Sequence, residues 1–137
     1  MIVFRLSKSA FAGDLSGRGA EKAGGRWNSK GTAVVYTSES RALCTTEIAV
    51  HTPLGILPID YVLVAINIPD SILIHELKPG ELPTDWKSLP HAHSTQEIGD
   101  AFVADNKFAI LKVPSAVVPG DFNFLLNPGH PDFRNVK

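Results

Sequence analysis

The chain has 137 residues, of which 44% are hydrophobic and 20% charged, and its formal net charge is −1. This length and balance predict one globular domain, residues 1–137, that buries enough apolar surface to fold without a disulfide or a metal. The near-neutral charge excludes an overall basic field, so we expect no direct nucleic-acid binding by this chain. Cys44 is the only cysteine, which rules out an internal disulfide and a cysteine-rich zinc site.

The sequence has no pattern that directs a chain to a membrane. Its start lacks a basic stretch followed by a long apolar run, unlike a secretory signal peptide. The longest apolar stretch, residues 61–68, is too short to cross a bilayer. These features predict a cytoplasmic protein without membrane association.

The first half of the chain predicts two strands and a helix. Apolar and β-branched runs indicate strands at residues 2–6 and 33–37, and the glycine-rich segment 11–30 between them predicts a long loop. A helix is expected from about residue 39 to 51, with Ser38 as N-cap and with Pro53 and Gly55 beyond its end. The residues on its predicted apolar face are Ala42, Leu43, Thr46, Ala49 and Val50.

The second half predicts four more strands and one more helix. The continuous apolar run 61–68 is typical of a strand covered on both faces, and another strand is expected at 71–77. After a proline-rich loop, Ser94 and Glu97 match a capping box that begins a helix ending near residue 106. Strands at 109–113 and 121–126 close the chain. Because helices and strands do not alternate regularly, the fold class is α+β with a mixed sheet.

The buried residues expected on that second helix are Ile98, Phe102 and Val103.

The segment Gly24-Gly25-Arg26-Trp27-Asn28 is the most unusual in the chain. Adjacent glycines allow close backbone approach to a ligand, and a guanidinium grips phosphate bidentately. With the Trp27 ring and the Asn28 amide, this set suits a dinucleotide-type ligand. The alternative is a structural turn in which Trp27 covers the core and Arg26 is solvated. No helix pattern begins at Gly24, so this is not a Rossmann fingerprint, and it has no P-loop ending.

Glu47 lies on or beside the inward face of the first predicted helix, so its carboxylate must be paired or line a cavity. A boundary glutamate that reaches water is the alternative. Arg5 in the first strand either faces solvent or joins Arg26 in an anion site. Tyr36, at the end of its strand, either stacks on a base or ribose or belongs to the core. Cys44 is expected to be an inert core thiol, and the histidines show no metal-ligand spacing.

The order of these segments resembles the RES domain, a family named for characteristic arginine, glutamate and serine residues. The matching segments are Phe4-Arg5, Gly24 to Asn28, Val34 to Ser38, Ala42-Leu43 with Glu47, Val113 to Val117, and Asn123 to Pro128. The resemblance implies a fold similar to ADP-ribosyltransferases and a toxin of a bacterial type II toxin–antitoxin system. Such toxins deplete NAD⁺ by hydrolysing or phosphorolysing its nicotinamide–ribose bond, and one branch transfers ADP-ribose to a protein. The implied partner is an Xre-type helix-turn-helix antitoxin, in a hetero-oligomer.

The resemblance also implies roles for individual residues. Arg5 and Arg26 would hold the pyrophosphate or the adjacent ribose of NAD⁺, Tyr36 would line the nicotinamide-ribose pocket, and Glu47 would be the family glutamate. The further substrate-binding residues would be Trp27, Asn28, Ser115 and Asn127. NAD⁺ is then the substrate, and neither a cofactor nor a metal is expected. A non-catalytic nucleotide-binding module is the remaining alternative, although it would have no need for the Glu47 carboxylate.

Overall fold

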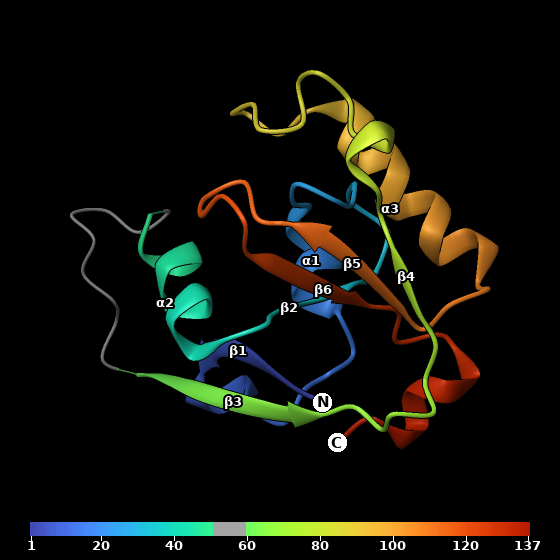
Figure 1. The fold of residues 1–137 in the computed structure, drawn as a ribbon. Coiled ribbons are helices and arrows are strands. Elements are labelled where there is room, and N and C mark those ends of the chain that lie inside the picture. Colours follow the sequence, from blue (N-terminus) through green and yellow to red (C-terminus); the bar gives the residue numbers. More distant parts are fainter. Residues whose placement is uncertain (51–59) are drawn as a thin grey trace.

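A six-stranded mixed sheet runs through residues 1–50 and 60–137, the part of the chain that the computed structural model describes (Figure 1). Its strands are β1 (Ile2–Lys8), β2 (Val35–Ser38), β3 (Tyr61–Asn67), β4 (Ile74–Glu76), β5 (Ile110–Pro114) and β6 (Phe122–Leu126). They lie in the order β3-β1-β2-β6-β5-β4. Neighbours are antiparallel except for the parallel pair β4 and β5.

Three α-helices accompany the sheet in the described residues: α1 (Arg18–Ala23), α2 (Arg41–Ala49) and α3 (His93–Asp105). Helix α2 packs on β1 and β2, whereas α3 lies on the side of β4 and β5 (Figure 1). Single 3₁₀ turns occur at Ser9–Phe11, Pro79–Glu81 and Pro131–Asn135. The α+β mixed-sheet prediction is therefore confirmed. None of the helices in the described ranges has the length and apolar character to span a membrane.

The sheet has a seam between β1 and β2. Strand β1 pairs with β3 along its whole length, from Ile2 to Lys8, and β2 pairs with β6 along four residues. Between β1 and β2, by contrast, the register joins only Phe4 to Ser38. The two strands diverge from that point, and the space between them is not closed by ladder hydrogen bonds.

Two clusters of buried side chains hold the layers together. The first joins β1, β2, β3 and β6 through residues such as Val3, Val35, Ile66 and Leu126. The second is built around the Trp27 ring and receives the apolar side of α3. Its buried members are Trp27, Val34, Leu77, Leu111, Val113 and Leu125. Ile98, Phe102 and Val103 of α3 pack against this second cluster, as the helix periodicity predicted.

Helix α2 begins two residues later than predicted. Its N-cap is Ser40, whose Oγ accepts a hydrogen bond from the Leu43 amide at 3.0 Å. Ser38 instead ends β2 and donates its hydroxyl to Asn123 Oδ1 at 2.7 Å, so the assignment of Ser38 as the cap was wrong. The buried residues are Leu43 and Cys44, whereas Ala42 and Val50, predicted on the apolar face, are exposed. The predicted end of the helix near residues 51–55 lies outside the described residues.

The predicted capping box of α3 is also wrong. The helix begins at His93, and its N-cap, Ala92, has no side-chain hydrogen bond to offer. Ser94 donates its hydroxyl to Asp85 Oδ1 at 2.7 Å, and Glu97 pairs with His93 at 3.0 Å. Asp85, the partner of Ser94, lies outside the helix, whereas Glu97 pairs with the residue four positions before it.

Two further expectations need correction. Strand β3, predicted to be covered on both faces, is an edge strand with Val62, Leu63 and Ala65 exposed. The predicted loop 11–30 contains helix α1, which buries none of its residues and therefore has no apolar periodicity to detect. Its N-cap, Gly17, has φ +75°, and a Cβ there would lie 2.8 Å from the Val34 nitrogen, so glycine is required.

We predict that Gly99→Ala strongly destabilises the fold. A Cβ at Gly99 would lie 1.5 Å from the carbonyl oxygen of Trp27, so α3 could not keep its position. The free energy of unfolding should fall by about 3 kcal/mol or more, measured by chemical denaturation. Gly19→Ala in α1 is the control, because its Cβ would meet nothing within 4 Å. That control should raise stability by up to about 1 kcal/mol. A Gly99→Ala protein as stable as the parent would contradict the packing of α3.

Candidate active site

A cleft of about 290 Å³ opens at the seam between β1 and β2. Helix α1 contributes Gly19 and Ala20 to its wall, and α2 contributes Cys44, Glu47 and Ile48. The side chains on the cleft wall that carry nitrogen or oxygen are Arg5, Tyr36, Thr37, Ser38, Glu47 and Asn123. The divergence of the two strands thus concentrates polar groups from distant parts of the chain.

Glu47 is the carboxylate of this cleft. Leu43 and Cys44, one turn before it on α2, are buried, and this anchoring turns Glu47 toward the seam. Its Oε1 accepts hydrogen bonds from Ser115 Oγ at 2.6 Å and from Asn123 Nδ2 at 2.8 Å. Within residues 1–50 and 60–137, no side chain or amide donates to Oε2. The prediction that Glu47 lines a cavity is confirmed.

Ser115 fixes the position of the Glu47 carboxylate through a hydrogen bond. It follows β5, is only 2% exposed, and its Oγ accepts from the amides of Val117 and Val118, each at 3.0 Å. Those two donors direct the hydroxyl proton toward Glu47. Ser115, predicted as a substrate-binding residue, is buried, does not line the cleft and instead contacts the carboxylate of Glu47.

Asn123 is a cleft residue that the sequence reasoning missed. Its Oδ1 accepts from Ser38 Oγ, which leaves Nδ2 directed at Glu47. The available signal was a single amide inside the otherwise apolar strand β6. The resemblance to the RES domain covered this segment, but the residue selected from it was Asn127.

Arg5 lines the cleft from β1, as predicted. One guanidinium nitrogen, Nη1, donates to the Asp14 carbonyl, and Nη2 donates to the Phe11 carbonyl and to Ser7 Oγ, both at 3.3 Å. Burial lowers the pKa of Arg5, and the nearby Asp14 carboxylate opposes that shift. The side chain therefore brings a positive charge to the cleft and also fixes the loop that leads to α1.

Arg26 does not join Arg5 in the cleft. Its Nη1 donates to the carbonyl oxygens of Trp86 at 2.8 Å and Ser88 at 3.1 Å. Burial lowers its pKa, and the Glu47 carboxylate, within electrostatic range, opposes that shift. The expectation of a paired Arg5 and Arg26 site for a diphosphate needs correction, because loop carbonyls already hold the Arg26 guanidinium.

The rest of the segment from Gly24 to Asn28 is scaffold. Trp27 is 3% exposed and belongs to the second core cluster, and the fully buried Asn28 amide donates to the carbonyls of Ala20 and Thr32. Neither side chain reaches the cleft, so their assignment to substrate binding is corrected. Of the two interpretations of this segment, the structural turn describes Trp27, which lies in the core, but Arg26 is bonded to loop carbonyls instead of being solvated.

Tyr36 joins this scaffold to the cleft. Its ring lines the cleft, while its hydroxyl accepts from the Trp27 amide at 3.0 Å and donates to Asn28 Oδ1 at 2.5 Å. Burial raises the pKa of Tyr36 well above its usual range, so the hydroxyl stays protonated. A Cβ at Gly25 would lie 2.7 Å from this hydroxyl, which explains a glycine at that position.

Two remaining candidates are structural. Asn127 is buried, donates to Asn106 Oδ1 at 2.9 Å and accepts from the Gly129 amide at 3.0 Å, and it does not line the cleft. Its assignment to substrate binding is therefore corrected. Cys44 is buried beside the cleft, and burial raises the pKa of its thiol to about 11, consistent with an inert core thiol.

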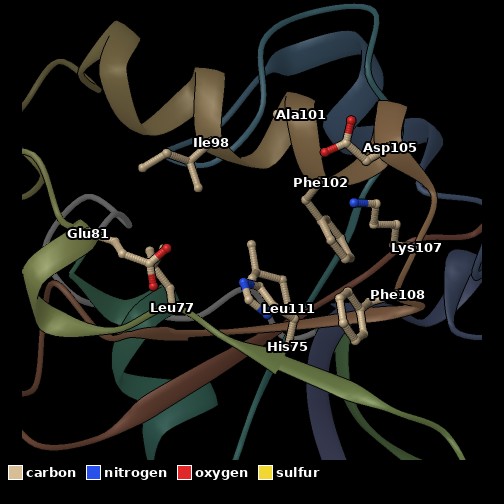
Figure 2. Close-up of a pocket in the computed structure, with 10 residues that line it drawn as sticks. All are labelled: His75, Leu77, Glu81, Ile98, Ala101, Phe102, Asp105, Lys107, Phe108 and Leu111. Carbon is tan, nitrogen blue, oxygen red and sulfur yellow. The ribbon is translucent and has the colours of Figure 1, made fainter.

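A second cavity, of about 410 Å³, lies beneath α3 and has a different character. Figure 2 shows Ile98 and Phe102 projecting from α3 toward Leu111, with the charged groups of Asp105 and Lys107 at the edge. Asp105 and Lys107 are exposed. Because the cleft at the seam holds its carboxylate by two side-chain donors, it is the stronger candidate for chemistry. No group of three metal-ligating side chains occurs in the described ranges.

Known proteins have the same fold as this chain. A chain in the crystal structure of the M. tuberculosis MbcT–MbcA toxin–antitoxin complex has the same fold, with a TM-score of 0.74 at 22% identity. The match covers 91% of this chain and 72% of that one. The model of the RES domain matches residues 2–137, and the chain belongs to the RES domain family.

Relatives with higher identity carry informative names. The Prs ADP-ribosylating toxin of Sphingobium sp. (strain YBL2) is 42% identical over 128 residues, which are 92% of this chain and 80% of the relative. Toxin Res of Yersinia enterocolitica is 36% identical over 135 residues, 98% of this chain and 88% of the relative. The sequence and fold of this chain are thus those of RES-domain toxins.

We predict that Tyr36→Phe destabilises the fold. The substitution keeps the ring on the cleft wall but leaves the Trp27 amide and the buried Asn28 oxygen without their partner. The free energy of unfolding should fall by about 1 to 3 kcal/mol, measured by chemical denaturation. Tyr61→Phe is the control, because the Tyr61 hydroxyl has no hydrogen bond among the described residues. Equal stability of both variants would show that the Tyr36 hydroxyl does not support the scaffold.

Proposed function

We propose that this RES-domain toxin consumes NAD⁺ by cleaving its nicotinamide–ribose bond and thereby arrests growth. The observation that carries this proposal is the carboxylate of Glu47, which lines the cleft and is held through Oε1 by Ser115 and Asn123. The resemblance to the RES domain supplies the substrate. Transfer of the ADP-ribose to water or to phosphate would give the depletion reaction.

The chemistry of the bond explains why one fixed carboxylate is sufficient. Nicotinamide leaves as a neutral molecule, so positive oxocarbenium character develops on the ribose while no strong acid is needed at the leaving group. A carboxylate already aimed at that position stabilises the developing charge without reorganising. The two donors on Oε1 prevent Glu47 from turning away. Oε2, to which none of the described residues donates a hydrogen bond, would face the ribose hydroxyls or an incoming nucleophile.

The other cleft residues would place the substrate. The Tyr36 ring offers a face to the nicotinamide riboside, and Arg5 on β1 offers positive charge to the anionic part of NAD⁺. Binding energy gained at these remote groups would align the reacting carbon with Glu47. Ser38, Ser115 and Asn123 would act only by positioning the carboxylate.

Glu47→Gln tests the proposal directly. Glutamine has the same shape and keeps an oxygen for Ser115 and Asn123 but removes the negative charge. We expect the rate of NAD⁺ loss to fall at least about 10²-fold, the melting temperature to stay close to that of the parent, and growth arrest to disappear. Glu97→Gln on the exposed surface of α3 is the control and should keep full activity. Consumption of NAD⁺ at the parental rate by Glu47→Gln would refute this role.

A second candidate function is mono-ADP-ribosylation of a cellular protein. The relative with 42% identity, named an ADP-ribosylating toxin, favours it. Both functions break the same bond and differ in the acceptor. Incubation with NAD⁺ labelled in its adenylate, with and without cell lysate and phosphate, separates them: depletion yields free ADP-ribose or its phosphate, whereas transfer yields a labelled protein band. Label that stays in small molecules when lysate is present would contradict transfer.

We also propose an antitoxin as partner. The resemblance to the RES domain implies an Xre-type helix-turn-helix protein whose C-terminal segment blocks the cleft, in a hetero-oligomer. The fold shared with the toxin–antitoxin complex from M. tuberculosis is compatible with this arrangement. The net charge of −1 supports DNA binding by the partner rather than by this chain. Both chains would work in the cytoplasm, where NAD⁺ is consumed.

A further inference from the structure

We propose that the cleft continues into a basic arm in which Arg18 and Lys22 of α1 bind the adenosine diphosphate half of NAD⁺. This inference rests on the proposed function and names residues for it that the sequence reasoning did not select. The Arg26 guanidinium is held by loop carbonyls, and the two terminal nitrogens of Arg5 already donate to three acceptors. A diphosphate therefore needs further positive groups.

A cavity of about 460 Å³ adjoins the cleft on the side of α1. The two spaces share Arg5, Leu6, Gly19 and Ile48 in their walls, so they lie side by side. Their volumes, about 290 and 460 Å³, together fall in the range of sites for ligands larger than a single ring system. With the nicotinamide riboside at Glu47, the remaining half of a dinucleotide would extend into the cavity beside α1.

The arm is positively charged, although the chain as a whole is not. Its basic residues are Arg5, Lys8, Arg18 and Lys22, against the single carboxylate of Asp14. Arg18 and Lys22 are four residues apart on α1 and thus share one face of the helix. No ion pair to the side chains of Lys8, Arg18 or Lys22 occurs in the described ranges, and residues 51–59 contain no acidic residue. These cations are therefore available to a phosphate.

The arm also offers aromatic surface. Phe11, which is 56% exposed, and Tyr61 line the same cavity as the basic side chains. An exposed phenylalanine beside basic side chains is a suitable surface for stacking a base next to its phosphates. The Phe11 carbonyl accepts from Arg5, so the arginine at the junction also holds this part of the loop in place.

Gly19 marks the junction between cleft and arm. It lines both spaces, and a Cβ built on it would meet nothing within 4 Å. A large side chain at this position would project into open space and fill the passage without disturbing the core. Gly19 therefore provides a steric test that is independent of charge.

The first experiment measures binding of ADP to the whole chain by titration calorimetry, together with steady-state kinetics. We expect the double variant Arg18→Ala/Lys22→Ala to bind ADP at least about tenfold more weakly and to show a similar rise in KM for NAD⁺, with kcat within about twofold. With nicotinamide riboside, which has no phosphate, the variant and the parent should react alike. Lys107→Ala/Arg134→Ala is the matched control, because it removes the same charges elsewhere on the exposed surface.

The second experiment compares Gly19→Trp with Gly19→Ala. The tryptophan variant should lose ADP binding at an unchanged melting temperature, and the alanine variant should retain it. If the parent consumes NAD⁺ but neither the double variant nor Gly19→Trp changes ADP binding or KM, the basic arm is refuted and the proposed function stands. If the parent binds ADP through Arg18 and Lys22 but leaves NAD⁺ intact, the arm is supported and the proposed function fails.

Discussion

The contact between β1 and β2 is the constraint on which this molecule depends. The two strands pair only between Phe4 and Ser38 and then diverge, so the sheet is open between them beyond this point. At that seam the Arg41 guanidinium lies 4.6 Å from the centre of the Phe4 ring and fastens the start of α2 to β1. The hydrogen bonds from Ser38 to Asn123 and from Asn123 to Glu47 connect β2, β6 and α2 across the opening. These contacts hold the elements around the opening in fixed positions.

The segment from Gly24 to Asn28 holds Tyr36 in the wall of the cleft. Besides the bonds to Tyr36, the carbonyl of Arg26 accepts from Thr95 Oγ1 at 2.6 Å and the carbonyl of Gly25 accepts from Gln96 Nε2 at 3.0 Å. Both donors belong to α3, so this short segment connects α3 to β2. Its unusual composition serves close backbone approach and hydrogen bonding inside the protein. A side chain that is suited to hold a ligand is equally suited to hold a backbone, and only the tertiary structure decides which.

The sequence alone was sufficient for the fold class, for most of the strands and for the place of Glu47 beside the inward face of its helix, although Ala42 and Val50, assigned to that face, are exposed. It was insufficient wherever a residue chose among partners distant in the chain. Ser38 bonded to β6 instead of capping α2, Arg26 turned to the carbonyls at residues 86 and 88, and Asn127 bonded to Asn106. The exposure of β3 followed from strand order, which periodicity does not encode. Helix α1 escaped detection because it buries no residue, and with it the cations Arg18 and Lys22 were overlooked.

The place of β6 in the sheet has a consequence for the timing of activity during synthesis. This strand is inserted between β2 and β5, although it is the last to be translated, and Ser115 and Asn123, which hold Glu47, come from the same late part of the chain. A nascent polypeptide that already contains Arg5, Tyr36 and Glu47 therefore still lacks the central strand and both donors to the carboxylate. In a RES-domain toxin, this order of synthesis leaves the cleft incomplete until β6 has been made.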